Sequence, residues 1–452
     1  MTVETLSPEK LITLIRLMSV LIPLTLAWLL ICMQRVTLRH LTGIYLAVLW
    51  CFLTLLFLNP LIIQSGGWSF PLSQMTFHQT PVDLVIGWAM VWGAIPHLSR
   101  TRLNLWTWLI LLFGLDVAVM PLLAPVVTLH ESWMLWDALC LAVAFVPSWY
   151  LARWTRERQF VYARAFLQMI LFTLIFNVLI PLIIIEEAYI RILPVPGQAL
   201  YAQVQPYWLQ IPVPLLIVYL GGLLLSLVPG LSALQEFALR GWGTPFPMDP
   251  PVKLVTTGPY AYLTNPMQVS QTLIYFWLGV LLDHYAFYFA AVLTLFFSRS
   301  YARWVESGNL AERFGPRWVG YRANARPFIP KWKPHRLRPA TVYLDLYGCR
   351  ACARVGKILS DLKPIQLTIK DARFFPDEDL KRMHYKDADG YQAGGIHALG
   401  RCMEHINLMW AFAGWIIRLP GISHAGQVVI DALFPPHRVC RIPSDGREIA
   451  DR

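Results

Sequence analysis

Long apolar runs, separated by short polar connections, occupy the first two thirds of the chain. A helix needs about 20 predominantly apolar residues to cross the hydrocarbon core of a bilayer. Nine runs approach that length: 11–33, 41–63, 81–98, 103–127, 133–151, 161–185, 207–229, 266–283 and 285–305. The pattern therefore predicts about nine transmembrane helices. Because only Asp283 and His284 separate the last two runs, these form either a tight pair of spans or a re-entrant hairpin.

Beyond Pro330 the pattern becomes that of a soluble domain. A basic, Pro-rich linker is followed by a strand in TVYLDLY, a turn and helix in GCRACARVGKILSDL, and a second strand in PIQLTIKDA. A polar connection then leads to a helical stretch over 395–418, which the sequence RLPG ends. The order strand, Cys-x-x-Cys, helix, strand is typical of the first βαβ unit of a thioredoxin-like fold. The predicted fold class is an all-α polytopic membrane protein with a C-terminal α/β thioredoxin-like domain.

The composition agrees with a membrane-embedded chain. Of 452 residues, 56% are hydrophobic and 14% are charged, whereas soluble domains carry about 25% charged residues. The 19 Trp and 18 Tyr residues suit the aromatic belts that lie at lipid headgroups. The N-terminal sequence MTVETLSPEK lacks the basic segment and the cleavage site of a signal peptide, so the first apolar run is predicted to be a true span.

Positive charges in the connections predict the orientation in the membrane. The connections after the first, third, fifth and seventh runs hold ten Lys or Arg residues: Arg35, Arg39, Arg100, Arg102, Arg153, Arg156, Arg158, Arg164, Arg240 and Lys253. The alternate side holds three, Lys10, Arg16 and Arg191. Because cytoplasmic loops are enriched in Lys and Arg, the N-terminus is predicted to lie outside a cell (inner) membrane and the C-terminal domain in the cytoplasm.

The net charge of +11 comes mostly from one block. Residues 299–338 carry 10 Lys or Arg against 2 Asp or Glu, whereas residues 1–298 carry 13 against 12 and residues 339–452 carry 15 against 13. The block directly follows the last apolar run, so the anionic headgroups of the lipid bilayer explain it better than nucleic acid does. The expected partners therefore include the bilayer and exclude nucleic acid.

An unusual loop precedes the run 266–283. It is rich in Pro and Gly and cannot form regular helix or sheet, although it lies at the membrane surface. It ends in GPYAYLTNPM, where Asn265 is predicted to cap the next helix and Pro266 suits its first turn. The start of a helix also offers free N–H groups to an anion. From these residues alone, a surface loop that only caps a helix and a ligand site are equal alternatives.

Fixed spacings recur on both sides of the predicted hairpin. The residues concerned are Gly241, Gly243, Thr244, Pro245, Gly258, Pro259, Tyr260, Tyr262, Asn265, Pro266, Glu306, Leu310, Phe314, Gly315, Trp318, Tyr321 and Pro330. They resemble the motifs of the isoprenylcysteine carboxyl methyltransferase family in its broad bacterial form, which includes phospholipid methyltransferases. That family often has Arg where this chain has Ala261 and Thr264, and Tyr where it has Gln268.

The resemblance implies methyl transfer from S-adenosyl-L-methionine to a lipophilic acceptor that bears a carboxylate, thiol or amine, at the cytoplasmic face. The implied cofactor-binding residues are Gly241, Gly243, Tyr260, Asn265, Pro266, Glu306 and Tyr321. An aromatic face such as Tyr260 or Tyr321 would hold the sulfonium cation. Glu306 would bind the ribose hydroxyls or the amino group, and the helix start at Asn265 with a nearby Arg would take the carboxylate.

The C-terminal domain carries a second candidate site. Cys349 and Cys352 begin a predicted helix, where the dipole favours a thiolate and the pair can close into a disulfide. Residues 341–442 resemble the DCC family of thiol-disulfide oxidoreductases, although Asp345 stands four residues before the first Cys where that family has three. The resemblance implies a redox pair. In a reducing cytosol, with a thiol reductant as partner, the pair would rest mostly as a dithiol.

Two further sets of residues carry alternatives. Cys349 and Cys352 could join Cys402 and His405 as a tetrahedral zinc set, but Cys402 and His405 fall in a helical run where such a pair is usually ordinary helix surface, so no metal is expected.

Asp116 and Asp137 fall within predicted spans, where acids are costly. They would either line a polar cavity or make helix-packing contacts.

The predicted organisation has four segments: N-terminal spans of no assigned role (1–206), a methyltransferase-like core (207–335), a linker (336–340), and a thioredoxin-like domain with its tail (341–452). The leading hypothesis is a membrane methyltransferase fused to a redox domain. The alternative is a membrane-anchored thiol-disulfide oxidoreductase with an inactive methyltransferase-like core, which the missing arginines favour. A third is a transport or scaffold protein, which the extra N-terminal spans favour.

Overall fold

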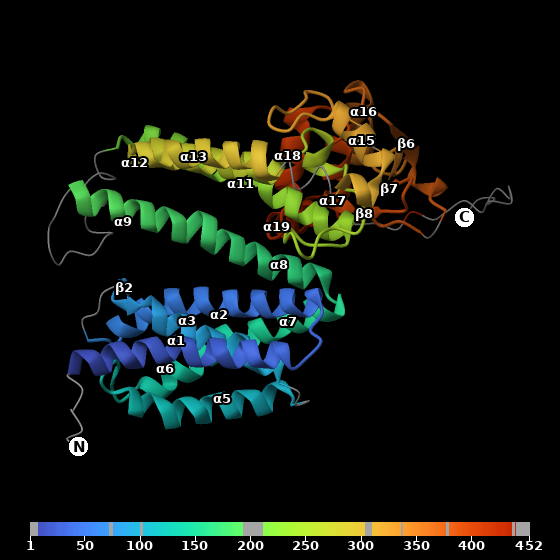
Figure 1. The fold of residues 1–452 in the computed structure, drawn as a ribbon. Helices are drawn as coiled ribbons and strands as arrows, with labels where there is room; N and C mark the ends of the chain where they lie inside the picture. Colours follow the sequence, from blue (N-terminus) through green and yellow to red (C-terminus); the bar gives the residue numbers. More distant parts are fainter. Residues whose placement is uncertain are drawn as a thin grey trace, which may run out of the picture. The chain divides into compact units, whose positions relative to one another are not determined.

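The computed structural model describes residues 8–71, 76–99, 103–192, 211–302, 310–335, 338–376, 379–435 and 439. The chain divides into two compact units. The first comprises Met1–Leu179 and Gly243–Pro250, and the second comprises Ile180–Trp242 and Pro251–Arg452. The described residues are mostly helical (Figure 1).

The first unit consists largely of apolar helices. They are α1 (Pro8–Cys32), α2 (Leu38–Gln64), α3 (Val82–Gly93), α4 (Ile95–Leu98), α5 (Leu105–Val119), α6 (Trp133–Cys140), α7 (Val146–Glu157) and α8 (Val161–Phe172). Helical turns extend three of them: η1 (Met120–Leu123), η2 (Leu141–Phe145) and η3 (Thr173–Leu179). Its connections contain two short antiparallel pairs, β1 (Trp68–Ser69) with β4 (Thr128–Leu129), and β2 (Thr76–Phe77) with β3 (Thr80–Pro81).

Helix α2 contributes much of the core of this unit. Leu46, Trp50 and Leu53 recur at helical spacing and pack against Leu151 of α7 and Leu171 of α8. The Trp50 indole N–H also donates to the backbone oxygen of Val143 at 3.1 Å. One stripe of α2 is therefore buried against its neighbours, as the period of 3.6 residues requires.

Asp116 on α5 and Asp137 on α6 are both buried. Trp92 Nε1 donates to Asp116 Oδ2 at 3.2 Å, which is a packing contact between helices. The Asp137 carboxylate has no hydrogen-bond partner among the described residues. The helix-packing alternative therefore holds for Asp116.

Six helices of the described residues are long and apolar enough to cross a membrane: Glu9–Cys32, Leu38–Gln64, Leu105–Leu123, Trp133–Glu157, Val161–Glu187 and Val213–Gly241. Each coincides with a predicted run. The predicted runs 81–98, 266–283 and 285–305 also fold as helices, but shorter ones, of which Val82–Leu98 is broken at Ala94. The structure thus supports six of the nine predicted spans by length, and the orientation inferred from loop charges stays a prediction.

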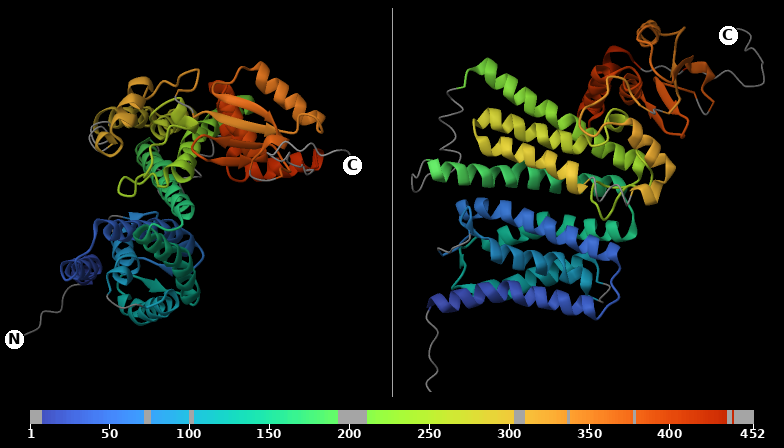
Figure 2. Two further views of the ribbon diagram at one scale, coloured as in Figure 1. Left: turned by 90° about the vertical axis from the view of Figure 1, so that its right-hand side faces the viewer. Right: turned by 45° about the horizontal axis from the view of Figure 1, so that its top comes forward.

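The membrane part of the second unit holds the predicted hairpin. It comprises α9 (Ile180–Ile192), α11 (Val213–Glu236) with its last turn η4 (Phe237–Gly241), α12 (Pro266–Leu282), and α13 (Tyr285–Phe297) with η6 (Ser298–Ala302). Helix α12 lies antiparallel to α13 and side by side with α11 (Figures 1 and 2). The predicted turn is confirmed, because Asp283 has a left-handed φ of 47° and His284 Nδ1 accepts from Ala286 N at 3.3 Å.

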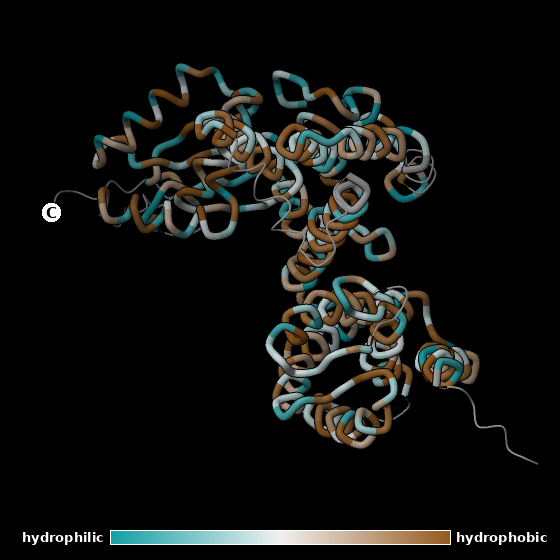
Figure 3. Tube along the Cα trace, turned by 90° about the vertical axis from the view of Figure 1, so that its left-hand side faces the viewer, coloured by the Kyte–Doolittle hydropathy of each residue, from teal (hydrophilic) through white to brown (hydrophobic). Residues whose placement is uncertain are grey.

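The C-terminal part of this unit contains a four-stranded sheet within the described residues. Strands β5 (Ala340–Leu344) and β6 (Leu367–Asp371) are parallel and joined by α16 (Arg350–Asp361). Strand β7 (His384–Asp387) pairs antiparallel with β5, and β8 (Gln392–Gly394) with β7, in the order β6-β5-β7-β8. Hydrophilic and hydrophobic residues alternate along α16, which covers one face of the sheet (Figures 2 and 3).

The predicted single helix over 395–418 is two helices, α17 (Gly395–Met403) and α18 (Leu408–Arg418). The break follows from Asn407, whose side chain accepts from Trp410 N at 3.2 Å and so caps a new helix. The sequence RLPG does end α18, and α19 (Ile422–Leu433) follows it.

Candidate functional site

The stretch GPYAYLTNPM begins with a short 3₁₀ turn, η5 (Gly258–Ala261), against the end of α11. Gly258 has a φ of 61°, and a Cβ there would lie 2.6 Å from Glu236 Cγ. Thr257 Oγ1 donates to Glu236 Oε2 at 2.6 Å. Both the backbone conformation and the space therefore require glycine at this position.

Main-chain hydrogen bonds hold the rest of the stretch to the segment after α15 (Pro316–Asn324). Thr264 N donates to Arg326 O at 2.9 Å, Lys331 N to Tyr262 O at 3.0 Å, and His335 N to Ala261 O at 2.7 Å. The loop before α12 is therefore bound through its main chain to part of the basic block after α13, although some 60 residues separate the two segments in sequence.

Asn265 and Pro266 stand at the start of α12. Pro266 occupies the first turn, as predicted. The expected side-chain cap is wrong, because the Asn265 amide makes no capping hydrogen bond and instead donates to Ser298 Oγ at 3.2 Å. Since Ser298 directly follows α13, this bond joins the two open ends of the hairpin.

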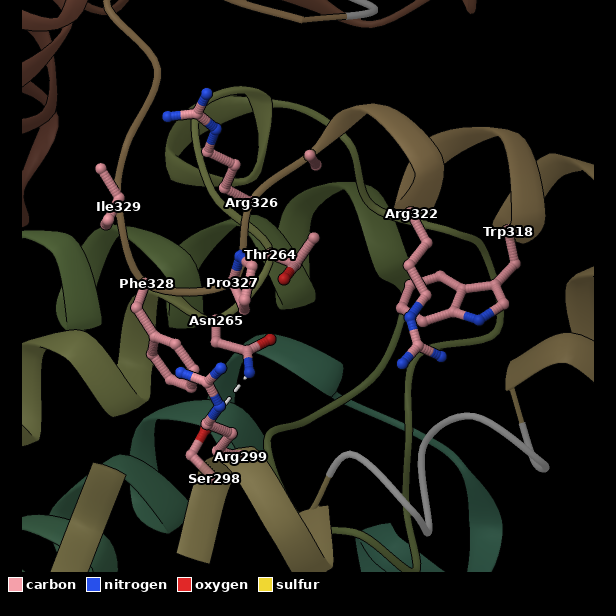
Figure 4. Close-up of a pocket in the computed structure, with 11 residues that line it drawn as sticks. Thr264, Asn265, Ser298, Arg299, Trp318, Arg322, Arg326, Pro327, Phe328 and Ile329 are labelled. Carbon is pink, nitrogen blue, oxygen red and sulfur yellow. Dashed lines mark hydrogen bonds between the residues drawn. The ribbon is translucent and has the colours of Figure 1, made fainter. Parts of the chain in front are cut away.

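A cavity of about 400 Å³ lies where these ends meet α15. Its lining consists of Thr264, Asn265, Ser298, Arg299, Trp318, Arg322, Ala325, Arg326, Pro327, Phe328 and Ile329 (Figure 4). The cavity is therefore built from the start of α12, the end of α13, one face of α15 and the segment that follows it.

The cavity is cationic. Arg299, Arg322 and Arg326 line it, and no carboxylate does among the described residues. In Figure 4 the guanidinium of Arg299 lies near Asn265 and Phe328, and that of Arg322 lies beside Trp318, whereas Arg326 is turned away. The Arg322 guanidinium stands 6.0 Å from the centre of a Trp318 ring. These arginines belong to the basic block that the charge pattern assigned to lipid headgroups, and the sequence pointed to them only as an unspecified Arg near the predicted helix start at Asn265.

The aromatic residues proposed for the sulfonium lie in the core instead. The Tyr260 ring stacks on Phe237 with ring centroids 5.1 Å apart, and Tyr260 O accepts from the Tyr321 hydroxyl at 2.7 Å. Tyr321 is 2% exposed, and burial raises its pKa well above the usual range. Neither ring lines the 400 Å³ cavity, whose aromatic walls are Trp318 and Phe328.

The other predicted cofactor residues lie elsewhere. Glu306 falls outside the described residues. Gly241 ends η4, and a Cβ there would lie 2.8 Å from Pro251 Cβ, so its role in the structure is close packing. Gly243 begins the segment Gly243–Pro250 of the first unit.

Ala261 stands where the family resemblance leads one to expect arginine, and it is 0% exposed. With Tyr262 and Leu263 it packs against Ala411 and Trp415 of α18. An arginine side chain would have no room there. Helix α18 therefore occupies the space that an arginine side chain at position 261 would need. The arginines that line the cavity come instead from the ends of α13 and α15.

A buried ionic network joins the same helices to α11. Glu236 Oε1 lies 2.6 Å from Arg418 Nη2 and 2.8 Å from Arg401 Nη2, and Glu404 pairs with both arginines. Burial by itself would lower the pKa of Arg401, but the carboxylate of Glu236 raises it well above its usual value. The network keeps these arginines charged inside the protein.

The candidate redox pair lies at the start of α16, after β5, as predicted. Cys349 is the N-cap residue, and its sulfur accepts from Cys352 N at 3.3 Å. Both thiols are free and partly buried, and burial raises the pKa of Cys352 to about 12. Asp345 Oδ1 accepts from Gly348 N at 2.7 Å, so this carboxylate orders the turn that leads to Cys349.

The zinc alternative is wrong for this set of residues. His405 Nδ1 is hydrogen-bonded to Ile365 O at 2.7 Å and its Nε2 to the Tyr385 hydroxyl at 2.9 Å, while Cys402 lies in the hydrophobic core. Among the described residues, no group of three or more His, Cys, Asp or Glu side chains is placed to hold a metal ion.

Residues 216–317 match the phospholipid methyltransferase family. The matched segment runs from α11 through η5 and the α12–α13 hairpin to the start of α15, and so contains Asn265, Ser298 and Arg299 of the cavity. It supports a membrane methyltransferase of the phospholipid or isoprenylcysteine type in this part of the chain. The C-terminal sheet and both cysteines of the candidate redox pair lie outside it. No curated protein and no solved structure matches the chain.

Proposed function

We propose that the core around residues 207–335 is an S-adenosyl-L-methionine-dependent methyltransferase that acts on a lipophilic acceptor, and that the 400 Å³ cavity holds the cofactor. One observation carries this proposal. Within and next to the segment that matches the methyltransferase family, the hairpin ends and α15 enclose a cavity with cationic and aromatic walls. Its size falls in the range of small-molecule sites, which is roughly 300–1,000 Å³.

The lining residues fit the chemical groups of such a cofactor. Arg299 and Arg322 would bind its carboxylate by charge-assisted hydrogen bonds. Trp318 and Phe328 would contact the adenine ring or the sulfonium, since aromatic faces attract cations. When bound, the cofactor supplies an activated methyl group, and the chain contributes mainly by positioning it against the acceptor.

The remaining predicted residues take supporting roles. Gly241 permits the close approach of the loop at Pro251, and the buried pair Tyr260 and Tyr321 holds α15 against η5. Glu306 would bind the ribose hydroxyls or the amino group. Asn265 and Pro266 set the start of α12 at the cavity. Gly243 would support the conformation of the loop at Pro251, as Gly241 does. The acceptor, which bears a carboxylate, thiol or amine, would arrive from the bilayer.

Cofactor binding by the purified full-length chain tests the proposal. We expect Arg299→Gln with Arg322→Gln to weaken S-adenosyl-L-methionine binding at least about tenfold, because each lost charge-assisted bond is worth roughly 1.5–3 kcal/mol. The matched control is Arg354→Gln with Lys357→Gln on exposed positions of α16, which removes the same net charge away from the cavity. Isothermal titration calorimetry measures both. No binding to wild type at millimolar cofactor would leave the redox or the scaffold alternative.

A second function has its own support. The parallel β5–α16–β6 unit with antiparallel β7 and β8 supports a thioredoxin-like fold for residues 341–452, and Cys349 caps its first helix. We propose that the Cys349 thiolate attacks a disulfide of a substrate and forms a mixed disulfide. Cys352 then displaces the substrate as a thiol, which leaves a Cys349–Cys352 disulfide. A thiol reductant in the cytoplasm would return both cysteines to thiols.

A further inference from the structure

A second, larger cavity of about 860 Å³ lies in the second unit, between the end of α11, α15 and the turn from β7 to β8. Its walls include Arg240, Lys253, Arg317, Arg338 and Asp389. The family match ends at residue 317, so part of this wall comes from a C-terminal region that the match does not cover.

The described residues that line this cavity carry a net positive charge. Among the described residues that line it, four are Lys or Arg and one is a carboxylate, Asp389. Arg240 Nη2 lies 2.5 Å from Asp387 Oδ2, behind the wall, and 3.5 Å from Asp389 Oδ2. Arg338 Nε shares Asp389 at 3.3 Å. The carboxylates of Asp387 and Asp389 are therefore already paired with Arg240 and Arg338.

Lys253 and Arg317 have no carboxylate partner among the described residues. The ammonium of Lys253 lies 4.8 Å from the centre of the Trp242 ring, which is itself exposed and lines the cavity. Arg317 is exposed at the start of α15. Among the described residues, these two exposed cations therefore border the same open space without a carboxylate partner, and both would attract an anion placed between them.

Helix α15 separates this cavity from the proposed cofactor site. Arg317 and Tyr321 line the larger cavity, whereas Trp318 and Arg322 line the smaller one. Residues four apart share a helix face, so the two cavities lie on two faces of one helix. A ligand in the larger cavity would therefore contact a different face of α15 from the proposed cofactor.

We propose that the larger cavity binds a phosphate group, with Lys253 and Arg317 as its principal contacts and Arg338 beside them. The planar guanidinium matches two phosphate oxygens, and the ammonium adds a compact point charge. The phosphate belongs either to an anionic phospholipid headgroup or to a soluble phosphorylated compound. This inference does not rest on the methyltransferase proposal, because it uses other residues and a different ligand.

The test uses the full-length chain in phosphatidylcholine nanodiscs at low salt. Its first arm titrates inorganic pyrophosphate by calorimetry, and its second measures phosphatidylglycerol retained by the protein in native mass spectrometry. We expect Lys253→Gln with Arg317→Gln to lower binding at least tenfold in one arm. Loss in the first arm assigns a soluble phosphate compound, and loss in the second alone assigns a headgroup.

A control variant makes the result specific. Arg354→Gln with Lys357→Gln removes an equal charge from exposed positions of α16 and should bind pyrophosphate and phosphatidylglycerol as wild type does. If the Lys253 and Arg317 variant binds as this control does in both arms, the proposal is overturned. Should the double variant express poorly, the single variants serve the same comparison.

Discussion

At the scale of single residues, the environment of a side chain decides its chemistry more than its place in a motif does. The Cys-x-x-Cys motif predicted a redox pair at a helix start, and the structure gives the two thiols different surroundings. Cys349 caps α16, whereas burial raises the pKa of Cys352 to about 12. A raised pKa favours the neutral thiol, so the Cys352 thiolate is scarce at neutral pH. Cys349 is therefore the attacking sulfur in the proposed exchange.

Alkylation kinetics test this inequality. In a Cys349→Ser variant, we expect iodoacetamide to modify Cys352 slowly at pH 8 and the rate to keep rising through pH 10, because burial, the largest cause of the raised pKa of Cys352, remains. Peptide mass spectrometry follows Cys352 apart from the other cysteines, with Cys352→Ser as the matched variant. A rate that levels off near pH 9 would show an ordinary thiol.

The surroundings of other predicted site residues follow from packing that the sequence does not display. Asn265 has the right type and place for a cap, yet Ser298, 33 residues later, takes its amide. Tyr260 and Tyr321 have the right spacing for a cofactor motif, yet the Tyr260 ring stacks on Phe237 and the Tyr321 hydroxyl donates to the backbone oxygen of Tyr260. Which partner a polar or aromatic group meets depends on which segments fold next to it.

At the scale of elements, α11 and the helices α17 and α18 depend on one ionic network. Glu236 ends α11 at a fully buried position and meets Arg401 and Arg418, and Thr257 donates to it from the loop before η5. Because these charges are out of water, each needs its partners. The network connects the membrane helix to the C-terminal helices that cover GPYAYLTNPM.

Removing this carboxylate tests the dependence. We expect Glu236→Gln to destabilise the protein by about 3–5 kcal/mol, since two buried guanidinium groups would lose their main counter-charge. Thermal melting of the purified chain measures the loss, and Glu312→Gln, at an exposed position of the same unit, is the control. Equal melting temperatures for both variants would mean that the network adds nothing to stability.

At the scale of the whole molecule, the proposed methyltransferase core is completed by a region outside the family match. Helix α18 buries Ala261 through Leu263, and the Tyr262 hydroxyl donates to Glu404 O at 2.8 Å. The loop at the start of α12 therefore owes part of its conformation to residues about 150 positions later. The C-terminal domain is therefore a structural part of the proposed site, independently of any redox function of its cysteines.

Truncation separates these two roles. We expect a chain that ends at His335 to lose S-adenosyl-L-methionine binding by at least tenfold, because Ala261 and Tyr262 would be uncovered. Full-length Cys349→Ser with Cys352→Ser keeps the packing and should bind as wild type does. Calorimetry on both variants provides the comparison. Wild-type affinity in the truncated chain would contradict a structural role for the domain.

The sequence by itself determined those features that depend on local pattern. Apolar runs specify membrane helices, and a strand, a Cys-x-x-Cys turn and a helix specify a βαβ unit, because burial follows the period of each element. Tertiary structure alone decided the rest. It brings Arg299 and Arg322 to the wall of one cavity and Lys253 and Arg317 to the wall of another. It also packs α18 against Ala261, where the family resemblance leads one to expect an arginine. These features join segments far apart in the chain, and no local pattern records which distant surfaces will bury one another.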